Sequence, residues 1–126
     1  NNTVELPQGW TPYGIRTSSS RTAITGNVVA QELLTIAGAS IALLNGADRS
    51  TITGNTLAPS ATGAGPAISI GSNESACTGN SCSLAAPPPT SAISVTGNNN
   101  VVVANVCMTA PAVNDLGVGN EVAHNI

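Results

Sequence analysis

A repeat of five units, each centred on an asparagine, constrains the fold of this chain more than any other feature of its sequence. In every unit an Ile, Val or Cys stands three positions before the asparagine, and another apolar residue follows one or two positions after it. The five residues are Asn27, Asn55, Asn80, Asn105 and Asn125. Their successive separations are 28, 25, 25 and 20 residues, and a period of that length is typical of solenoids.

A second marker, an Ile or Val, lies 12 to 14 residues before each of these asparagines. These residues are Ile15, Ile41, Ile68, Ile93 and Val113. Because the separation of the two markers is nearly constant, each unit is expected to be one coil of three short strands. Such strands are too short to bury their apolar faces alone, and stacked coils solve that problem. The sequence therefore predicts an all-β fold, a right-handed parallel β-helix (solenoid) of about five coils over residues 13–126.

Equivalent residues of successive coils are predicted to stack into interior columns, because side chains two positions apart on a strand share one face. The first strand adds Thr17, Leu43, Ile70 and Val95 to the Ile and Val markers. The second strand contributes Ile24, Ile52, Cys77, Val102 and Val122. The third contributes Val29, Leu57, Cys82 and Cys107.

The asparagine of each coil is expected at a sharp bend between the second and third strands. Asn tolerates the left-handed αL conformation that such a bend requires. Its side-chain amide can also donate and accept hydrogen bonds toward the asparagines of the neighbouring coils. An asparagine ladder with a rung every ~4.8 Å is therefore predicted along the axis.

Length varies most between each asparagine and the following first strand, in segments that include residues 31–34, 58–66 and 87–89. Insertions in a solenoid map to one face, which is often the binding face. Residues 1–12, with Trp10, are predicted to cap the N-terminal end, because an open stack of strands invites edge association. The C-terminal coil has no such segment, and three explanations are open: it meets a partner subunit, it meets a neighbouring domain, or the chain is a fragment of a longer protein.

Composition excludes several classes of partner. The chain has a formal net charge of -3 and three Lys+Arg, all of them Arg, which leaves little to neutralise nucleic-acid phosphates. No apolar stretch approaches the roughly 20 residues that span a bilayer, so membrane insertion is not expected. The three Cys and one His lack the spacing of a zinc site. No metal and no cofactor are therefore expected.

Charged residues are concentrated in the turn between the first and second strands. Arg21, Arg49 and Glu74 each stand six residues before their asparagine, and Ser20, Asp48 and Asn73 precede them. Arg49 is expected to pair with Glu74 or with Asp48. An exposed charge column that adds little stability is the favoured interpretation, and a sugar-binding ridge is the other. The candidate ligand-binding residues are Arg21, Asp48, Arg49 and Glu74.

The three cysteines are expected inside the solenoid. Cys82 and Cys107 hold equivalent positions in adjacent coils, so their Cα atoms should lie about 5 Å apart, within the range for a disulfide. Free Cys is also among the most buried residue types. Buried thiols are favoured over a bridge, and in either case one of the three must stay unpaired within the chain.

No residue is assigned a catalytic role. Glycoside hydrolysis needs two carboxylates ~5 to 10 Å apart, whereas Glu74 and Glu121 are expected in the same kind of turn but two coils apart. His124 directly precedes the last asparagine, where it is expected to be a surface residue near a coil end.

The five Asn bends and the five upstream Ile or Val residues resemble the right-handed parallel β-helix repeat that pectate lyases, polygalacturonases and phage tailspikes share. The resemblance implies the fold over nearly the whole chain. It says little about function, because this architecture hosts lyases, hydrolases, adhesins and inert stalks. Enzymes of this kind use clustered Asp, Arg, Lys or His, and the chain has no Lys and one His.

The leading hypothesis is a non-catalytic structural module of a virion or cell surface, such as a phage capsid decoration or tailspike-type protein. Its expected partners are protein subunits, either further copies in a homo-oligomer such as a trimer or capsid and tail proteins. The second hypothesis is a carbohydrate-binding adhesin that recognises surface polysaccharide. A fragment of a polysaccharide lyase or hydrolase is the third. The expected location is a virion or the extracellular surface of a cell.

Overall fold

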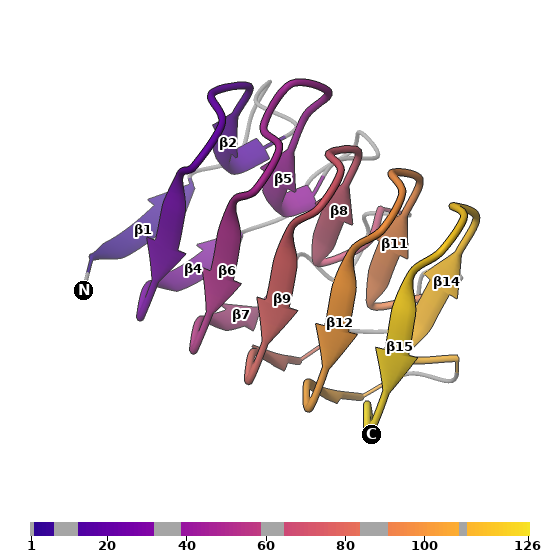
Figure 1. Ribbon diagram of the computed structural model, residues 1–126. Coiled ribbons are helices and arrows are strands. Elements are labelled where there is room, and N and C mark those ends of the chain that lie inside the picture. Colours follow the sequence, from indigo (N-terminus) through magenta and orange to yellow (C-terminus); the bar gives the residue numbers. More distant parts are fainter. Residues whose placement is uncertain (1, 7–12, 32–38, 59–64, 84–90, 109–110) are drawn as a thin grey trace.

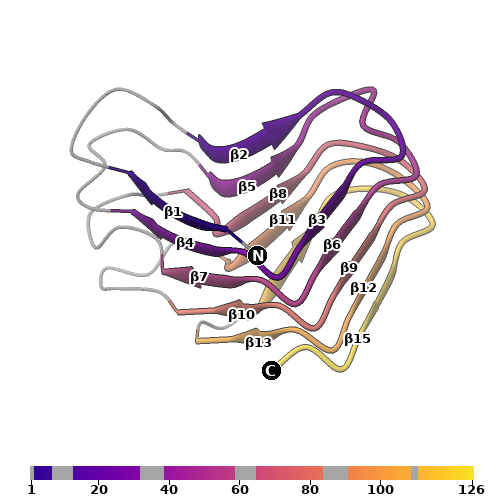
Figure 2. The same cartoon turned by 90° about the vertical axis from the view of Figure 1, so that its left-hand side faces the viewer.

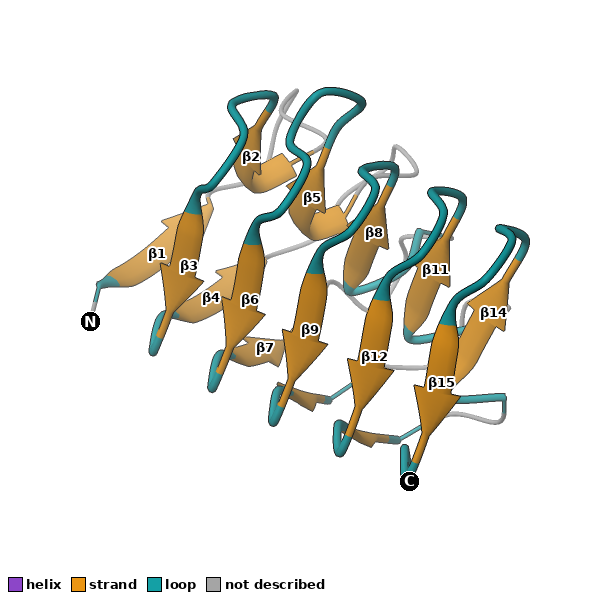
Figure 3. Ribbon diagram, in the orientation of Figure 1, coloured by secondary structure: helices purple, strands orange, loops and turns teal. Residues whose placement is uncertain are grey.

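The computed structural model describes residues 2–6, 13–31, 39–58, 65–83, 91–108 and 111–126. Within them the chain is an all-β parallel solenoid without helices, which confirms the predicted fold class. Three sheets form its sides, and each contains five parallel strands (Figure 1; Figure 3). The two termini lie at opposite ends of the stack (Figure 1).

Each coil contributes one strand to each sheet, and Figure 2 shows the sheets as three sides around the interior. Sheet B consists of β2 (Tyr13–Thr17), β5 (Ala39–Leu43), β8 (Ile68–Ile70), β11 (Ile93–Val95) and β14 (Val113–Asp115). Sheet C consists of β3 (Ala23–Thr25), β6 (Thr51–Thr53), β9 (Ala76–Thr78), β12 (Val101–Val103) and β15 (Glu121–Ala123). Sheet A consists of β1 (Thr3–Leu6), β4 (Val28–Gln31), β7 (Thr56–Ala58), β10 (Ser81–Cys82) and β13 (Val106–Cys107).

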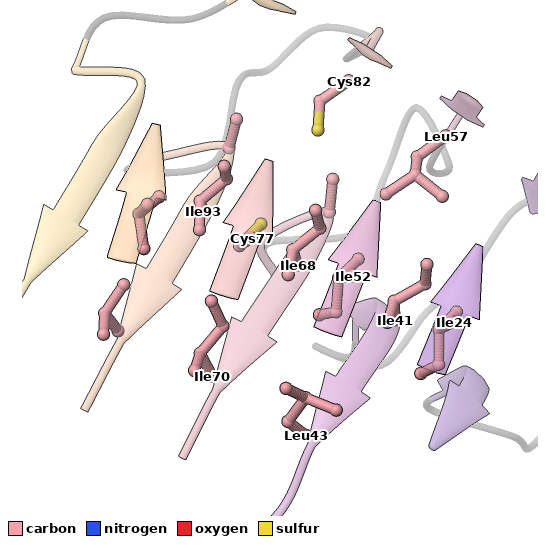
Figure 4. Packing of buried hydrophobic residues seen from close by; sticks show 14 of the residues in the cluster. Ile24, Ile41, Leu43, Ile52, Leu57, Ile68, Ile70, Cys77, Cys82 and Ile93 are labelled. Carbon is pink, nitrogen blue, oxygen red and sulfur yellow. The ribbon is translucent and has the colours of Figure 1, made fainter. Parts of the chain in front are cut away.

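The register of the three sheets confirms the predicted interior columns. In sheet B, Ile41 pairs with Ile68, and Ile68 pairs with Ile93. In sheet C, Ile52 pairs with Cys77. These side chains are fully or almost fully buried, and they stack against their equivalents along the axis (Figure 4). On β8 and β11 the residue between two buried apolar side chains is only partly buried, as the period of two predicts, whereas β5 is buried along its whole length.

The asparagine ladder is also confirmed. The backbone N–H of Asn55 donates to Oδ1 of Asn80 (3.0 Å), and the Asn55 side-chain Nδ2 donates to the same oxygen (2.9 Å). Asn80 repeats both bonds toward Asn105. The central asparagines are buried, so these amides satisfy polar groups that the bend would otherwise leave without partners.

The predicted backbone conformation of the asparagine was wrong. Positive φ angles lie instead at the residue before each ladder asparagine: Gly26 (φ 63°), Gly54 (φ 64°), Gly79 (φ 62°), Ala104 (φ 56°) and His124 (φ 54°). The bend is therefore made by the preceding residue. None of the five ladder asparagines has a positive φ. The asparagine side chain accepts hydrogen bonds from the neighbouring coil.

The solenoid begins earlier than residue 13. Thr3–Leu6 forms β1, which pairs in parallel with β4, and Val4 packs against the core. Asn2 extends the ladder, because its backbone N–H and its Nδ2 donate to Oδ1 of Asn27 (3.2 and 3.4 Å). The remainder of the predicted cap, with Trp10, lies outside the described residues. Most residues of the variable connections also lie outside them.

Candidate functional site

The turn between sheets B and C, here called the polar turn, comprises residues 18–22, 44–50, 71–75, 96–100 and 116–120 of the successive coils. Equivalent residues of this turn have positive φ in every coil: Arg21 (φ 58°), Arg49 (φ 59°), Glu74 (φ 55°), Asn99 (φ 57°) and Gly119 (φ 72°). The predicted column of Arg21, Arg49 and Glu74 is therefore confirmed. Each of these residues stands at the same corner of its coil.

Two further side-chain ladders fix the polar turn. In the first, the Asn73 N–H donates to Oδ1 of Asp48 (2.8 Å), and the Asn98 N–H donates to Oδ1 of Asn73 (2.8 Å). In the second, the Ser50 N–H donates to Oγ of Ser75 (3.1 Å). The Ser75 N–H donates in turn to Oδ1 of Asn100 (2.9 Å). The turn is thus held to the stack by side chains, although its residues lie outside the sheets.

A pocket of about 290 Å³ lies on the polar turn near the N-terminal end of the stack. It is lined by Ser20, Arg21, Asp48, Arg49 and Glu74. The four candidate ligand-binding residues of the sequence analysis therefore do lie together. They come from three successive coils, because the stack superposes equivalent turn positions.

Of the two partners expected for Arg49, the structure selects Glu74. Nε of Arg49 lies 2.7 Å from Oε2 of Glu74. This hydrogen bond and the charge of Glu74 raise the pKa of Arg49. The pair is exposed, with 61% and 51% of the two side chains accessible, so solvent screens it and its contribution to stability is small. Asp48 instead uses Oδ1 to accept the Asn73 N–H.

Backbone conformation distinguishes the pocket residues from their equivalents in later coils. Non-Gly residues with positive φ are uncommon, and Asn and Gly are the types that tolerate this region best. The later coils follow that preference with Asn99 and Gly119, whereas the pocket coils place Arg21, Arg49 and Glu74 there. Strained residues gather at functional sites more often than elsewhere. This contrast favours a binding role for the pocket.

The pocket has the chemistry of a polar binding site. Arg21 offers guanidinium donors, Ser20 a hydroxyl, and Asp48 a second carboxylate oxygen. Such a set suits a ligand that carries both hydroxyl groups and an anionic group. Among the described residues no group of three or more His, Cys, Asp and Glu is placed to hold a metal ion.

A second surface lies on the C-terminal coil, residues 111–126. Leu116, Val118 and Ile126 are exposed there by 67%, 75% and 76%. Val122 belongs to an interior column, yet it is 40% exposed, because no described strand lies beyond β15. A depression of about 220 Å³ includes Val113 and Val122 in its lining. The ends of two interior columns are therefore accessible at this end of the stack.

The structure separates the two glutamates that the sequence placed in the same kind of turn. Glu74 lies in the polar turn, whereas Glu121 is the first residue of β15. His124 is exposed at the bend before Asn125, as expected. It lines the C-terminal depression together with Pro111 and Asn125.

Sequence reasoning missed the second ladder of the polar turn. Its members are Ser50, Ser75, Asn100 and Asn120. These four residues share only a side-chain oxygen that accepts a hydrogen bond. Because two are serines and two are asparagines, a search for one repeated residue type does not find the ladder. It also missed Asn2, although this residue stands 25 positions before Asn27.

No described segment forms a helix with the length and hydropathy that crossing a bilayer requires. Comparisons of the chain with protein-family models, with curated proteins and with solved structures return no match.

Proposed function

We propose that this protein is a non-catalytic structural module of a virion or cell surface, comparable to a phage decoration or tailspike segment, that assembles with partner subunits. The observation that carries the proposal is the apolar surface of the C-terminal coil. Leu116 and Val118, two positions apart in the polar turn of this coil, are 67% and 75% exposed in a chain that is only 7% charged. Exposed apolar side chains that lie together are typical of protein interaction sites. The partner we propose is a protein subunit that presents apolar side chains to Leu116 and Val118 of the polar turn.

The resemblance to right-handed parallel β-helix proteins gives the proposal its biological setting. Phage tailspikes and related surface proteins share this repeat. The side-chain ladders along the bend and the polar turn join successive coils and suit a structural role. The proposed location is accordingly a virion or the outside of a cell.

Assembly is tested by measuring the molar mass in solution by light scattering over a range of concentrations, with and without reductant. The expected result is an oligomer, such as a trimer, whose mass does not depend on reductant. Val118→Asp should shift it toward monomer. The matched control is Val28→Asp, which places the same charge on the outer face of sheet A, where Val28 is 44% exposed. A wild-type chain that stays monomeric at every concentration would contradict the proposal.

A second function, carbohydrate binding by an adhesin, is favoured by one observation: the pocket that joins Arg21, Asp48, Arg49 and Glu74. Its donors and acceptors suit hydroxyl groups of a surface polysaccharide. None of the described residues that line the pocket carries an aromatic ring on which a sugar could stack. Affinity would then depend on charged hydrogen bonds and should fall with rising salt.

A broad glycan panel tests this second function. The expected result is at least one binder whose affinity falls tenfold or more in Arg21→Gln. The control is Arg16→Gln, which removes the same charge from β2, where the Arg16 guanidinium lies 5.7 Å from the Tyr13 ring centroid and outside the pocket. If no glycan binds, or if both variants lose binding equally, the pocket is not a carbohydrate site.

A further inference from the structure

Two cysteines lie directly opposite each other on adjacent strands of sheet A. Cys82 on β10 and Cys107 on β13 are register partners. Both side chains belong to the interior column that contains Leu57, and Figure 4 shows Cys82 beside Leu57. The strand spacing places their Cα atoms about 4.8 Å apart, within the range of about 4.4 to 6.8 Å that disulfides span. Neither forms a disulfide in this structure.

The third cysteine is not equivalent to this pair. Cys77 lies on β9 in sheet C, and the asparagine ladder engages its sulfur: Nδ2 of Asn80 donates to Cys77 Sγ (3.4 Å). The Cys77 thiol donates to Oδ1 of Asn105 (3.8 Å). Burial, the largest effect, raises the pKa of Cys77 to about 12, so its thiol is protonated at neutral pH. A protonated, buried thiol of this kind is a poor nucleophile.

We propose that Cys82 and Cys107 form an oxidative modification site, a dithiol that a small disulfide such as oxidised glutathione converts into a bridge between adjacent coils. The register of β10 and β13 and the shared interior column carry this inference. It does not depend on the proposed function, because it concerns the inside of the solenoid.

Cys107 is the residue that reacts first. It is 7% exposed, whereas Cys82 is 1% and Cys77 0% exposed. Hydrogen bonding to the Cys82 thiol lowers the pKa of Cys107, against the effect of burial. The same interaction with Cys107, together with burial, raises the pKa of Cys82. Accessibility and thiolate character therefore coincide at one sulfur, as thiol–disulfide exchange requires.

The reaction balances in two exchanges. The Cys107 thiolate attacks one sulfur of oxidised glutathione, forms a mixed disulfide and releases one glutathione thiolate. Cys82 then loses its proton to water, and its sulfur attacks the Cys107 sulfur and releases the second glutathione. Two protein thiols are oxidised to one disulfide, and one molecule of oxidised glutathione is reduced to two of glutathione.

The test is to incubate the reduced protein with oxidised glutathione and to measure its intact mass and its remaining thiols after unfolding. The wild type should lose two hydrogen atoms and keep one alkylatable thiol. Cys77→Ala should lose two hydrogen atoms and keep none. Cys82→Ala should instead accumulate glutathione on Cys107, and Cys107→Ala should gain neither a bridge nor glutathione. The thermal unfolding midpoint should rise on oxidation in the wild type and in Cys77→Ala only.

Three outcomes would overturn the proposal. The first is an intramolecular bridge that persists in Cys82→Ala or Cys107→Ala, because it would have to involve Cys77. The second is oxidation that yields only covalent dimers. The third is a wild type that retains all three thiols while far-UV circular dichroism shows the native β spectrum, since the pair would then be inert filling of the core.

Discussion

Asn80 donates two hydrogen bonds to the same oxygen, Oδ1 of Asn105, one from its backbone N–H (3.0 Å) and one from its side-chain Nδ2 (2.9 Å). Its own Oδ1 accepts the two equivalent bonds from Asn55. Nδ2 of Asn80 also donates to the carbonyl oxygen of Ile52 (3.0 Å). One buried amide thus joins three successive coils at the bend, in addition to the backbone hydrogen bonds that flank it.

Replacement of Asn80 by Ala should destabilise the protein strongly. The change removes the acceptor of the buried Asn55 backbone N–H. It also removes one acceptor of Asn55 Nδ2, which keeps the carbonyl oxygens of Ile24 and Thr53. A buried unsatisfied group costs roughly 1 to 3 kcal/mol. We expect the free energy of unfolding, measured in urea, to fall by about 3 kcal/mol or more. Asn45→Ala is the control. This asparagine lies exposed in the polar turn, and its loss should change stability by less than about 0.5 kcal/mol.

The residue before each ladder asparagine offers a pair of opposite substitutions. Ala104 has a φ of 56°, whereas Gly79 holds the same place in the preceding coil with a φ of 62°. A Cβ at Gly79 would meet nothing within 4 Å, so Gly79→Ala tests backbone strain alone. Ala104→Gly should stabilise and Gly79→Ala should destabilise, each by about 1 kcal/mol.

The control for this pair is Ala76→Gly on β9, where the backbone is extended. There the same change should destabilise by about 0.5 to 1 kcal/mol, because glycine loses more conformational freedom on folding. If Ala104→Gly lowers the thermal unfolding midpoint as Ala76→Gly does, the bend does not require a left-handed residue.

The sequence was sufficient to predict the parts of this fold that depend on residue type. A column such as Ile41, Ile68 and Ile93 needs an apolar side chain in each coil, so its period is visible in the sequence. The place of the left-handed residue was not predictable from the asparagine, since glycine, alanine and histidine all occupy it. The choice between Asp48 and Glu74 as the partner of Arg49 depends on side-chain conformation, and the spacing of residues in the sequence does not specify it.

The loss of stability on truncating an interior side chain to Ala should depend on where in its column the residue lies. Ile68 is fully buried between Ile41 and Ile93, so Ile68→Ala should cost about 3 to 4 kcal/mol through lost burial and the cavity it leaves. Val113 ends the same column and is only partly buried. Val113→Ala should cost about 1 kcal/mol or less by urea unfolding. Similar costs for both would contradict the stacking order.

The buried thiol of Cys77 should make the protein less stable at high pH. Its pKa is raised from 9.0 to about 12 by burial, so between these values the unfolded chain loses the proton and the folded chain keeps it. The stabilising effect of the raised pKa is complete below pH 9 and is lost as the pH rises toward 12. The slope for this group is about 1.4 kcal/mol per pH unit.

Cys77→Val removes that ionisation without opening a large cavity. Its free energy of unfolding, measured in urea from pH 8 to pH 11, should fall less steeply with pH than that of the wild type, by the equivalent of one proton. Parallel pH profiles for the two proteins would show that folding does not raise the pKa of Cys77.

Amide hydrogen exchange, followed residue by residue by NMR, tests most directly whether the ladder holds the coils together. The backbone N–H groups of Asn55, Asn80 and Asn105 donate to the next asparagine of the stack and not to a strand. We predict that the amides of Asn55 and Asn80 exchange only on global unfolding, with an opening free energy equal to that measured in urea. Exchange of these amides at the rate of an unstructured peptide, while the strand amides stay protected, would contradict the account.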